Sequence, residues 1–127
     1  MPEPPLTDPP EPTLADWARR AARAADDTLG RAPVGIEVGD VLAITDFFVI
    51  SGGGTVRQVR AIADEVEEQL TLLDGPKPVR VEGRDDYRWV LMDFGGFVVH
   101  LLDEEARVFY DLERLWSDCP RLEWQPA

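Results

Sequence analysis

The chain has 127 residues, enough for one domain with a buried core, and its shares of hydrophobic (44%) and charged (30%) residues are those of an ordinary globular protein. It carries 25 acidic against 13 basic residues, a net charge of −12. This balance argues against non-specific binding to DNA, RNA or an anionic membrane surface, which requires an excess of cations, and it favours a basic partner.

Cys119 and His100 are the only residues of their kinds, so neither an internal disulfide nor a Cys/His zinc site can form. A reduced, cytoplasmic setting is therefore predicted, with no metal and no cofactor. The opening "MPEPPLTDPPEP" has no basic and apolar regions of a signal peptide, and no apolar run reaches the length of a membrane-spanning helix.

The first half of the chain predicts a tail, two helices and two strands. Six prolines make residues 1–12 a disordered tail. A helix begins at Thr13, which forms a capping box with Asp16, and ends before Gly30. Strands are expected at "PVGIEV" (33–38) and "TDFFVIS" (45–51). A second amphipathic helix begins at Thr55, with Gln58 completing another capping box, and ends before "DGPKP" (74–78).

The second half predicts three further strands and one long helix. The strands are "VRVEG" (79–83) and a hairpin at 88–93 and 97–102, and the helix is "EARVFYDLERLW" (105–116), which Pro120 prevents from continuing. The predicted fold is thus α/β (α+β): a single domain at 13–119, with a mixed five-stranded sheet flanked by helices, and a C-terminal tail at 120–127.

The glycine-rich "SGGG" (51–54) lies between a strand and a helix, where phosphate-binding loops occur. Its spacing is not that of a phosphate-binding loop, and the third glycine of a dinucleotide fingerprint is replaced by Arg57. A structural turn is the main interpretation. A nucleotide-binding or nucleotidyltransferase-like enzyme using this loop and Arg57 is the alternative, although paired metal-binding carboxylates are lacking on the next strand.

The hairpin "RWVLMDFGGFVVHLL" (88–102) contains Asp93 and His100. A loop of two or four residues pairs Asp93 with Val98 and Leu91 with His100, which makes Asp93 and His100 diagonal neighbours on one face. Three interpretations stay open: a catalytic dyad, a buried and mutually satisfied polar pair, or a recognition surface shared with Trp89.

Three segments in this order resemble the ribosomal silencing factor family, also called RsfS or Iojap-like proteins. "ITDFFVISGGGTVRQVRAIADEV" is similar to the family's Asp-aromatic-Phe-Val-Ile strand, glycine turn and Arg-Gln helix start. "VEG" followed by "WVLMDFGGFVVHLL" is similar to its Glu-Gly step and Trp–Asp–Gly–Val-Val-His hairpin, and "ARVFYDLERLWSD" to its Arg–Tyr–Leu-Glu–Leu-Trp signature. Gly96 and Phe47 depart from the usual residues of the family.

The resemblance implies a non-enzymatic factor with a nucleotidyltransferase-like fold. Such a factor docks on ribosomal protein L-fourteen of the large subunit, sterically blocks joining of the small subunit, and represses translation when nutrients are short. Members are often homodimers when free. The matched positions expected to bind the partner are Trp89, Leu91, Asp93, His100, Tyr110, Glu113 and Trp116, with Trp116 also compatible with a core role. A small dimeric adaptor for another basic protein is a third hypothesis.

Overall fold

The computed structural model describes residues 11–125, so most of the predicted proline-rich tail lies outside the described residues. The helices are α1 (Leu14–Asp27), α2 (Val56–Leu72), α3 (Glu104–Tyr110) and α4 (Leu112–Leu115). The strands are β1 (Val34–Glu37), β2 (Phe47–Gly53), β3 (Arg80–Glu82), β4 (Trp89–Asp93), β5 (Phe97–Asp103) and β6 (Arg121–Leu122). Among these residues, no helix has the length and hydropathy needed to cross a membrane.

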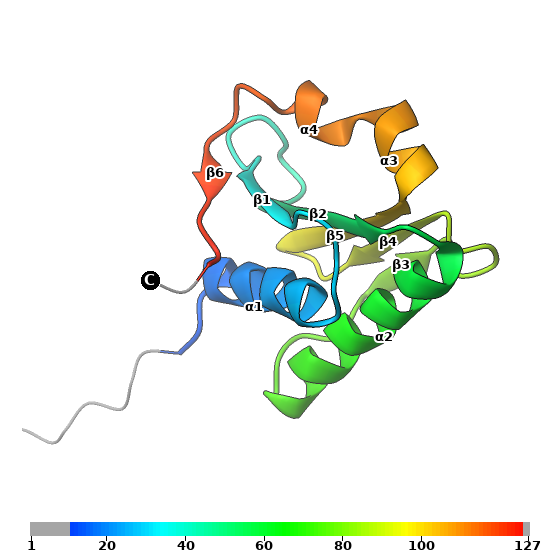
Figure 1. The fold of residues 1–127 in the computed structure, drawn as a ribbon. Helices are drawn as coiled ribbons and strands as arrows, with labels where there is room; N and C mark the ends of the chain where they lie inside the picture. The colour runs from blue at the N-terminus through cyan, green and yellow to red at the C-terminus, as the bar shows by residue number, and fades with distance from the viewer. Residues whose placement is uncertain (1–10, 126–127) are drawn as a thin grey trace, which may run out of the picture.

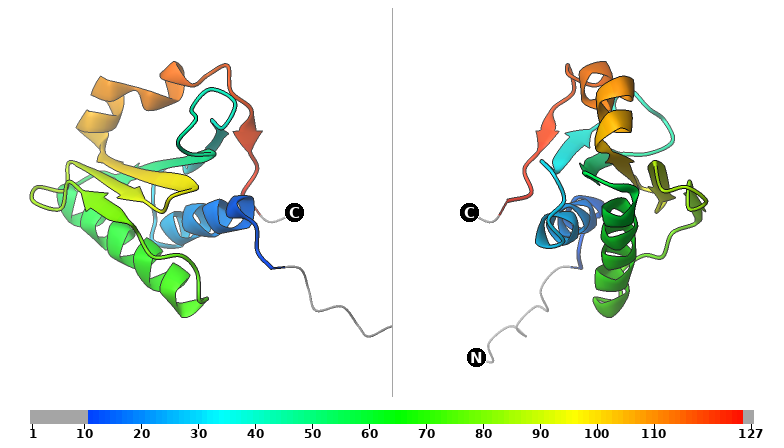
Figure 2. Two further views of the ribbon diagram at one scale, coloured as in Figure 1. Left: turned by 180° about the vertical axis from the view of Figure 1, so that it is seen from behind. Right: turned by 45° about the vertical axis from the view of Figure 1, so that its right-hand side comes forward.

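The strands form one mixed sheet in the order β3-β4-β5-β2-β1-β6, in which only β2 and β5 run parallel. Helices α1 and α2 cover one face, and the shorter α3 and α4 lie on the other (Figures 1 and 2). Alternate residues of the central strands therefore enter two different hydrophobic clusters: Val49 and Val99 point toward α1 and α2, whereas Ile50 and Val98 point away from them.

Local sequence explains where both long helices begin. The Thr13 hydroxyl accepts the Asp16 N–H while the Asp16 carboxylate accepts the Thr13 N–H, so the predicted capping box is complete. Thr55 caps α2 in the same way, but the Gln58 side-chain oxygen accepts the N–H of Gly54 instead of the N–H of the cap. The second predicted capping box is therefore only half formed.

Small side chains let α1 pack closely against the rest of the domain. Five alanines of α1 are buried, namely Ala18, Ala21, Ala22, Ala24 and Ala25. Alanine has the highest helix propensity and holds neighbouring elements only a short distance apart. The alanine-rich sequence thus supplies both the helix and the face by which it contacts α2 and β2.

The hairpin has the predicted register. Asp93 pairs with Val98 and Leu91 with His100, and the Phe94 N–H donates to the Phe97 carbonyl across a turn in which Gly95 has φ of 92°. A positive φ of this size favours glycine. The prediction that Trp89 and His100 lie on one face of the sheet is confirmed.

The sheet has six strands, so the prediction of five is wrong by one. Residues 121 and 122, expected within a tail at 120–127, form β6 and pair with β1. The prediction missed this strand because Pro120 and the short length of the segment suggested an unstructured end. The packed part of the chain therefore includes β6 and Trp124, which lie beyond residue 119.

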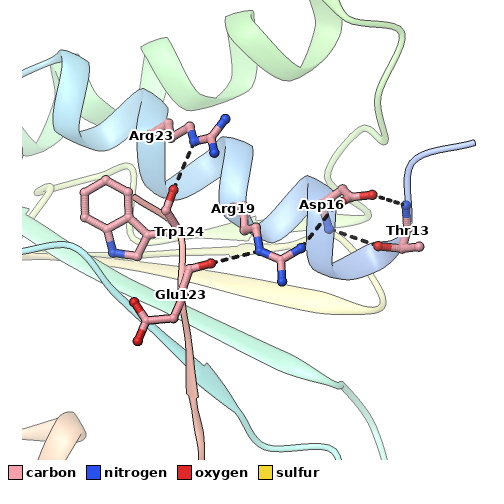
Figure 3. Close-up of polar contacts among 6 residues, drawn as sticks. All are labelled: Thr13, Asp16, Arg19, Arg23, Glu123 and Trp124. Carbon is pink, nitrogen blue, oxygen red and sulfur yellow. Dashed lines mark hydrogen bonds and ion pairs between the residues drawn. The ribbon is translucent and has the colours of Figure 1, made fainter. Parts of the chain in front are cut away.

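The segment after β6 is anchored on α1 and on the entry to β1. The Trp124 side chain is only 7% exposed, and its indole N–H donates to the Pro33 carbonyl at 2.8 Å. Arg19 and Arg23 of α1 donate to the backbone carbonyls of Glu123 and Trp124 at 2.8 and 3.0 Å (Figure 3). We call residues 120–125 the C-terminal strap. It covers the edge of β1, which would otherwise be open.

The single helix predicted at 105–116 is divided into α3 and α4. Asp111 between them has φ of 46°, in the left-handed region, where aspartate is tolerated better than most residues. The break turns the apolar positions of the two halves in different directions. The helix therefore does not present one continuous apolar face to the sheet, and three of its apolar side chains, Val108, Phe109 and Leu115, are exposed to solvent.

Candidate functional site

An exposed phenylalanine forms the centre of the most exposed apolar region on α3. Phe109 is 78% exposed and Val108 is 77% exposed, although both are large apolar side chains. Helix α3 contacts the sheet mainly through the small, buried Ala106 at its first turn, so the side chains that follow project outward. Large exposed apolar side chains that gather in one place mark an interaction site.

Phe109 lies between two hollows. One, of about 480 Å³, is lined by Asp86, Arg88, Trp89, Glu105, Ala106, Phe109 and Tyr110. The other, of about 540 Å³, is lined by Gly54, Glu104, Glu105, Val108 and Phe109. We call these two hollows together with Phe109 the α3 face. Its apolar ridge with carboxylates around it suits a partner that offers both apolar and basic groups.

A chain of aromatic contacts supports the α3 face from below. The Tyr110 ring lies 4.6 Å from the Trp89 ring between centroids, and the Trp89 indole N–H donates to Nδ1 of His100 at 3.1 Å. The His100 ring in turn meets Phe48 edge-on at 4.7 Å, and Phe48 meets Trp116 at 5.5 Å. Trp89 and Tyr110 line the hollow, whereas His100 and Phe48 hold Trp89 in position from the interior.

His100 is a buried structural residue. It is 5% exposed, and burial lowers its pKa to about 4, so the imidazole is neutral at pH 7. Because Nδ1 accepts the Trp89 N–H, the proton must reside on Nε2, which has no hydrogen-bond partner among the described residues.

Asp93 does not contact His100. Its carboxylate accepts the N–H of Gly95 at 2.8 Å and lies 3.9 Å from Arg80, so it stabilises the hairpin turn and the edge of the sheet. It also lies four positions after Trp89, about 13 Å along β4. Both interpretations that required an Asp93–His100 pair, the catalytic dyad and the mutually satisfied pair, are therefore wrong.

The other predicted residues have supporting positions. Leu91 and Trp116 are half-buried and pack on the cluster that contains Ile50 and Leu102. Glu113 is bound by Arg107 at 3.0 Å. Of the seven predicted partner-binding residues, the structure therefore brings Trp89 and Tyr110 to the hollow, with His100 directly behind them.

Arg107 is a positioning residue that was not among the predicted residues. Its guanidinium, with a side chain only 16% exposed, pairs with Glu113 and donates to the carbonyls of Arg31 and Ala32 at 2.5 and 2.7 Å. It thus ties α3, α4 and the segment before β1 together. The spacing of an arginine and a glutamate on either side of Asp111 was the available sequence signal.

Replacing Arg107 with methionine keeps most of the side-chain volume and removes these contacts. We expect the free energy of unfolding to fall by about 1–3 kcal/mol, because Glu113 and the two carbonyls lose a charged donor. Urea unfolding measures this change. Arg114→Met is the matched control, since Arg114 is exposed and has no ion pair among residues 11–125. Equal stability of the two variants would contradict the role of Arg107.

The glycine-rich segment has a structural explanation. Gly52 and Gly53 belong to β2, and a Cβ on Gly52 would overlap the carbonyl oxygen of Leu102 on β5. The Gly54 N–H is already bound by Gln58. Ser51 is fully buried and donates to the Arg31 carbonyl at 3.1 Å. The glycines permit close pairing of the two parallel strands, as the structural interpretation predicted.

Comparison with known proteins supports the family resemblance that the sequence indicated. Residues 11–127 match the family model described as "Ribosomal silencing factor during starvation". The chain belongs to the ribosomal silencing factor family. It is 38% identical over 103 residues to the ribosomal silencing factor RsfS of Halalkalibacterium halodurans, covering 81% of this chain and 87% of that protein. It is 37% identical over 100 residues to that of Bacillus subtilis, covering 79% and 84%.

Solved structures support the ribosomal silencing factor fold. A crystal structure of a Chromobacterium violaceum protein aligns with a TM-score of 0.78 at 27% identity, over 91% of both chains. One from Bacillus halodurans aligns with a TM-score of 0.69 at 35% identity, covering 83% of this chain and 94% of that chain. The resemblance that the three sequence segments indicated is thus confirmed, as is the mixed α+β domain.

Proposed function

We propose that this ribosomal silencing factor binds the large ribosomal subunit by placing its α3 face on ribosomal protein L-fourteen. The bound factor would occupy the space that the small subunit needs, and so would reduce translation when nutrients are limited. The observation that carries the proposal is the exposed Phe109, which lies between two hollows lined by Trp89, Tyr110 and carboxylates. An interface hot spot is commonly an aromatic side chain that becomes buried on binding and has polar groups around it.

Charge supports a basic protein partner. Asp86, Glu104 and Glu105 line the hollows of the α3 face, and the whole chain has a net charge of −12. Carboxylates at the rim of an interface attract lysine and arginine of a partner over several ångströms and raise the rate of encounter. We therefore expect association to slow as ionic strength rises.

The proposal includes no catalytic step. His100 is buried and bound to Trp89, and Ser51 is buried in β2, so neither is available to a substrate. The nucleotide-binding alternative has no support in the geometry of Gly52 and Gly54, which pack against β5 and Gln58. A thermal-shift screen with nucleotides and Mg²⁺ tests that alternative. A nucleotide that raised the melting temperature would support it.

We also propose that the factor acts in the cytoplasm and pairs with a second copy when no ribosome is present. Exposed apolar side chains such as Phe109 and Ile44 leave apolar surface that association would cover. Light scattering of the free protein tests this part. A molar mass of one chain at micromolar concentration would contradict it.

Phe109→Ala tests the proposed docking directly. We expect the affinity for isolated large subunits to fall by about 2 kcal/mol, roughly 30-fold, since a central aromatic anchor is lost. Stability should be unchanged because the side chain is exposed. Co-sedimentation over a range of concentrations measures the affinity. Leu72→Ala is the matched control: Leu72 is 75% exposed and is the last residue of α2, at the end of the helix away from Val56, on the opposite face of the sheet from α3. Equal affinities for the two variants would contradict docking through Phe109.

A further inference from the structure

Two arginines of α2 have no acidic partner. Arg57 and Arg60 lie one turn apart and are both exposed, and neither forms an ion pair or a side-chain hydrogen bond among residues 11–125. Six other arginines do form ion pairs there: Arg19, Arg31, Arg80, Arg84, Arg88 and Arg107. In a chain with 25 acidic residues, two neighbouring unpaired guanidinium groups form a local site for an anion.

The two arginines line a hollow with an aromatic wall. It measures about 460 Å³ and is lined by Val56, Arg57, Arg60, Ala61, Asp64 and Tyr87. The Arg60 guanidinium lies 5.7 Å from the centroid of the Tyr87 ring, within the range of a cation–π contact. The one carboxylate in the hollow, Asp64, is bound by Arg84 at 3.1 Å. The negative charge of Asp64 is thus balanced by Arg84, and it does not neutralise Arg57 or Arg60.

Tyr87 is held in a strained conformation. Its φ is 57°, a left-handed value that a bulky side chain rarely adopts. The N–H of Tyr87 donates to the Gly83 carbonyl at 3.0 Å, and the Arg84 side chain lies 3.5 Å from its hydroxyl. These contacts place the ring at the hollow. Tyr87 is half-buried against the core, and the rest of its ring forms a wall of the hollow beside two cations. A strained backbone at such a place is a reason to expect a ligand there.

The hollow adjoins the α3 face. Asp86 and Gly54 line the α3 face, and Tyr87 and Val56, one and two residues later in the chain, line this hollow at the first turn of α2. A particle seated on Phe109 would therefore bring its neighbouring surface to Arg57 and Arg60. Since a ribosomal subunit exposes RNA around its surface proteins, the groups facing this hollow would be the phosphates and bases of that RNA.

We propose that the Arg57–Arg60–Tyr87 hollow binds a single-stranded RNA segment of the large subunit, next to the docked protein; this rests on the proposed function. Paired guanidinium groups bind a phosphate through charge-assisted hydrogen bonds. The Tyr87 ring and the Arg60 guanidinium beside it offer a surface for an unstacked base. The overall charge of −12 disfavours RNA elsewhere on the chain, so this contact would be local.

The test compares Arg57→Gln/Arg60→Gln with wild type in co-sedimentation with large subunits at 50 and 200 mM salt. Losing two phosphate contacts to a single strand lowers the slope of log affinity against log salt by about 1.4. Over this fourfold range, wild type should therefore lose about 7-fold more affinity than the variant. Lys77→Gln/Arg121→Gln, which removes two exposed bases elsewhere, should keep the wild-type slope.

A second arm uses the purified ribosomal protein without RNA, to which the Arg57/Arg60 variant and wild type should bind equally. A wild-type salt slope in the Arg57/Arg60 variant would overturn the RNA contact, and so would a loss of binding to the purified protein, which would assign the hollow to protein. Either result leaves the proposed function intact if Phe109→Ala still weakens docking. Failure of wild type to bind large subunits at any salt would overturn both proposals.

Discussion

Replacing Trp124 with alanine is expected to lower the free energy of unfolding by about 3–5 kcal/mol, the range for large aromatic side chains removed from a core. The indole is 7% exposed and belongs to the hydrophobic cluster beneath α1 and α2. The substitution also removes the hydrogen bond to the Pro33 carbonyl, and it loosens the strap that covers β1. Chemical denaturation followed by circular dichroism measures the change.

Trp124→Phe separates packing from hydrogen bonding. The phenyl ring preserves most of the buried area but cannot donate to Pro33, so about 1–2 kcal/mol should be lost. Leu115→Ala serves as a control, since Leu115 is 71% exposed. If Trp124→Ala cost no more than Leu115→Ala, the C-terminal strap would not be part of the cooperative fold.

The second large effect is a pH dependence that originates at His100. Its folded-state pKa is about 4, against 6.5 for an ordinary histidine. At pH 7 the imidazole is neutral in both states. Between pH 6.5 and 4 the unfolded chain binds a proton that the folded chain does not, so stability falls as the pH falls. A difference of about 2.5 pH units corresponds to about 3 kcal/mol.

His100→Gln provides the reference for this measurement. Glutamine can still accept the Trp89 N–H but does not titrate, so the variant should lack the histidine contribution. Carboxylates titrate in both proteins, and the difference between the two curves of unfolding free energy against pH therefore isolates His100. Curves that run parallel from pH 7 to pH 4 would show that His100 is as easily protonated in the folded protein as in the unfolded chain.

Local rules allowed prediction of the parts of the fold that depend on neighbouring residues. Thr13 and Thr55 begin the two long helices because a cap needs only the next few residues. The hairpin register follows from the turn at Gly95, which fixes every pair between β4 and β5. Family resemblance could be seen from the sequence because three short motifs occur in a fixed order.

Non-local contacts could not be predicted in this way. Strand β6 has two residues and pairs with β1, more than 80 residues earlier, so no local pattern marks it. The break at Asp111 depends on how α3 and α4 settle on the sheet. His100 has two diagonal neighbours in the hairpin, Asp93 and Trp89, and the register places both within reach. Side-chain conformation, which no local sequence pattern indicates, selects Trp89.

Only part of the candidate site was predicted, because the exposure of a side chain also depends on non-local contacts. The aromatic residues Trp89 and Tyr110 were identified through the family motif, and they line the hollow. The exposure of Phe109 was not predicted, because the helix at 105–116 was predicted to be continuous. The break at Asp111 instead leaves Phe109 exposed, where it forms the ridge of the α3 face.

The most direct test of the central claim is a subunit-joining measurement. Large subunits are incubated with the factor, small subunits are added, and formation of the complete ribosome is followed by light scattering. The amount of complete ribosome should fall as the factor occupies the large subunit, and Phe109→Ala should need roughly 30-fold more protein for the same effect. Normal joining of large subunits already saturated with the factor would contradict the claim that it keeps the small subunit away.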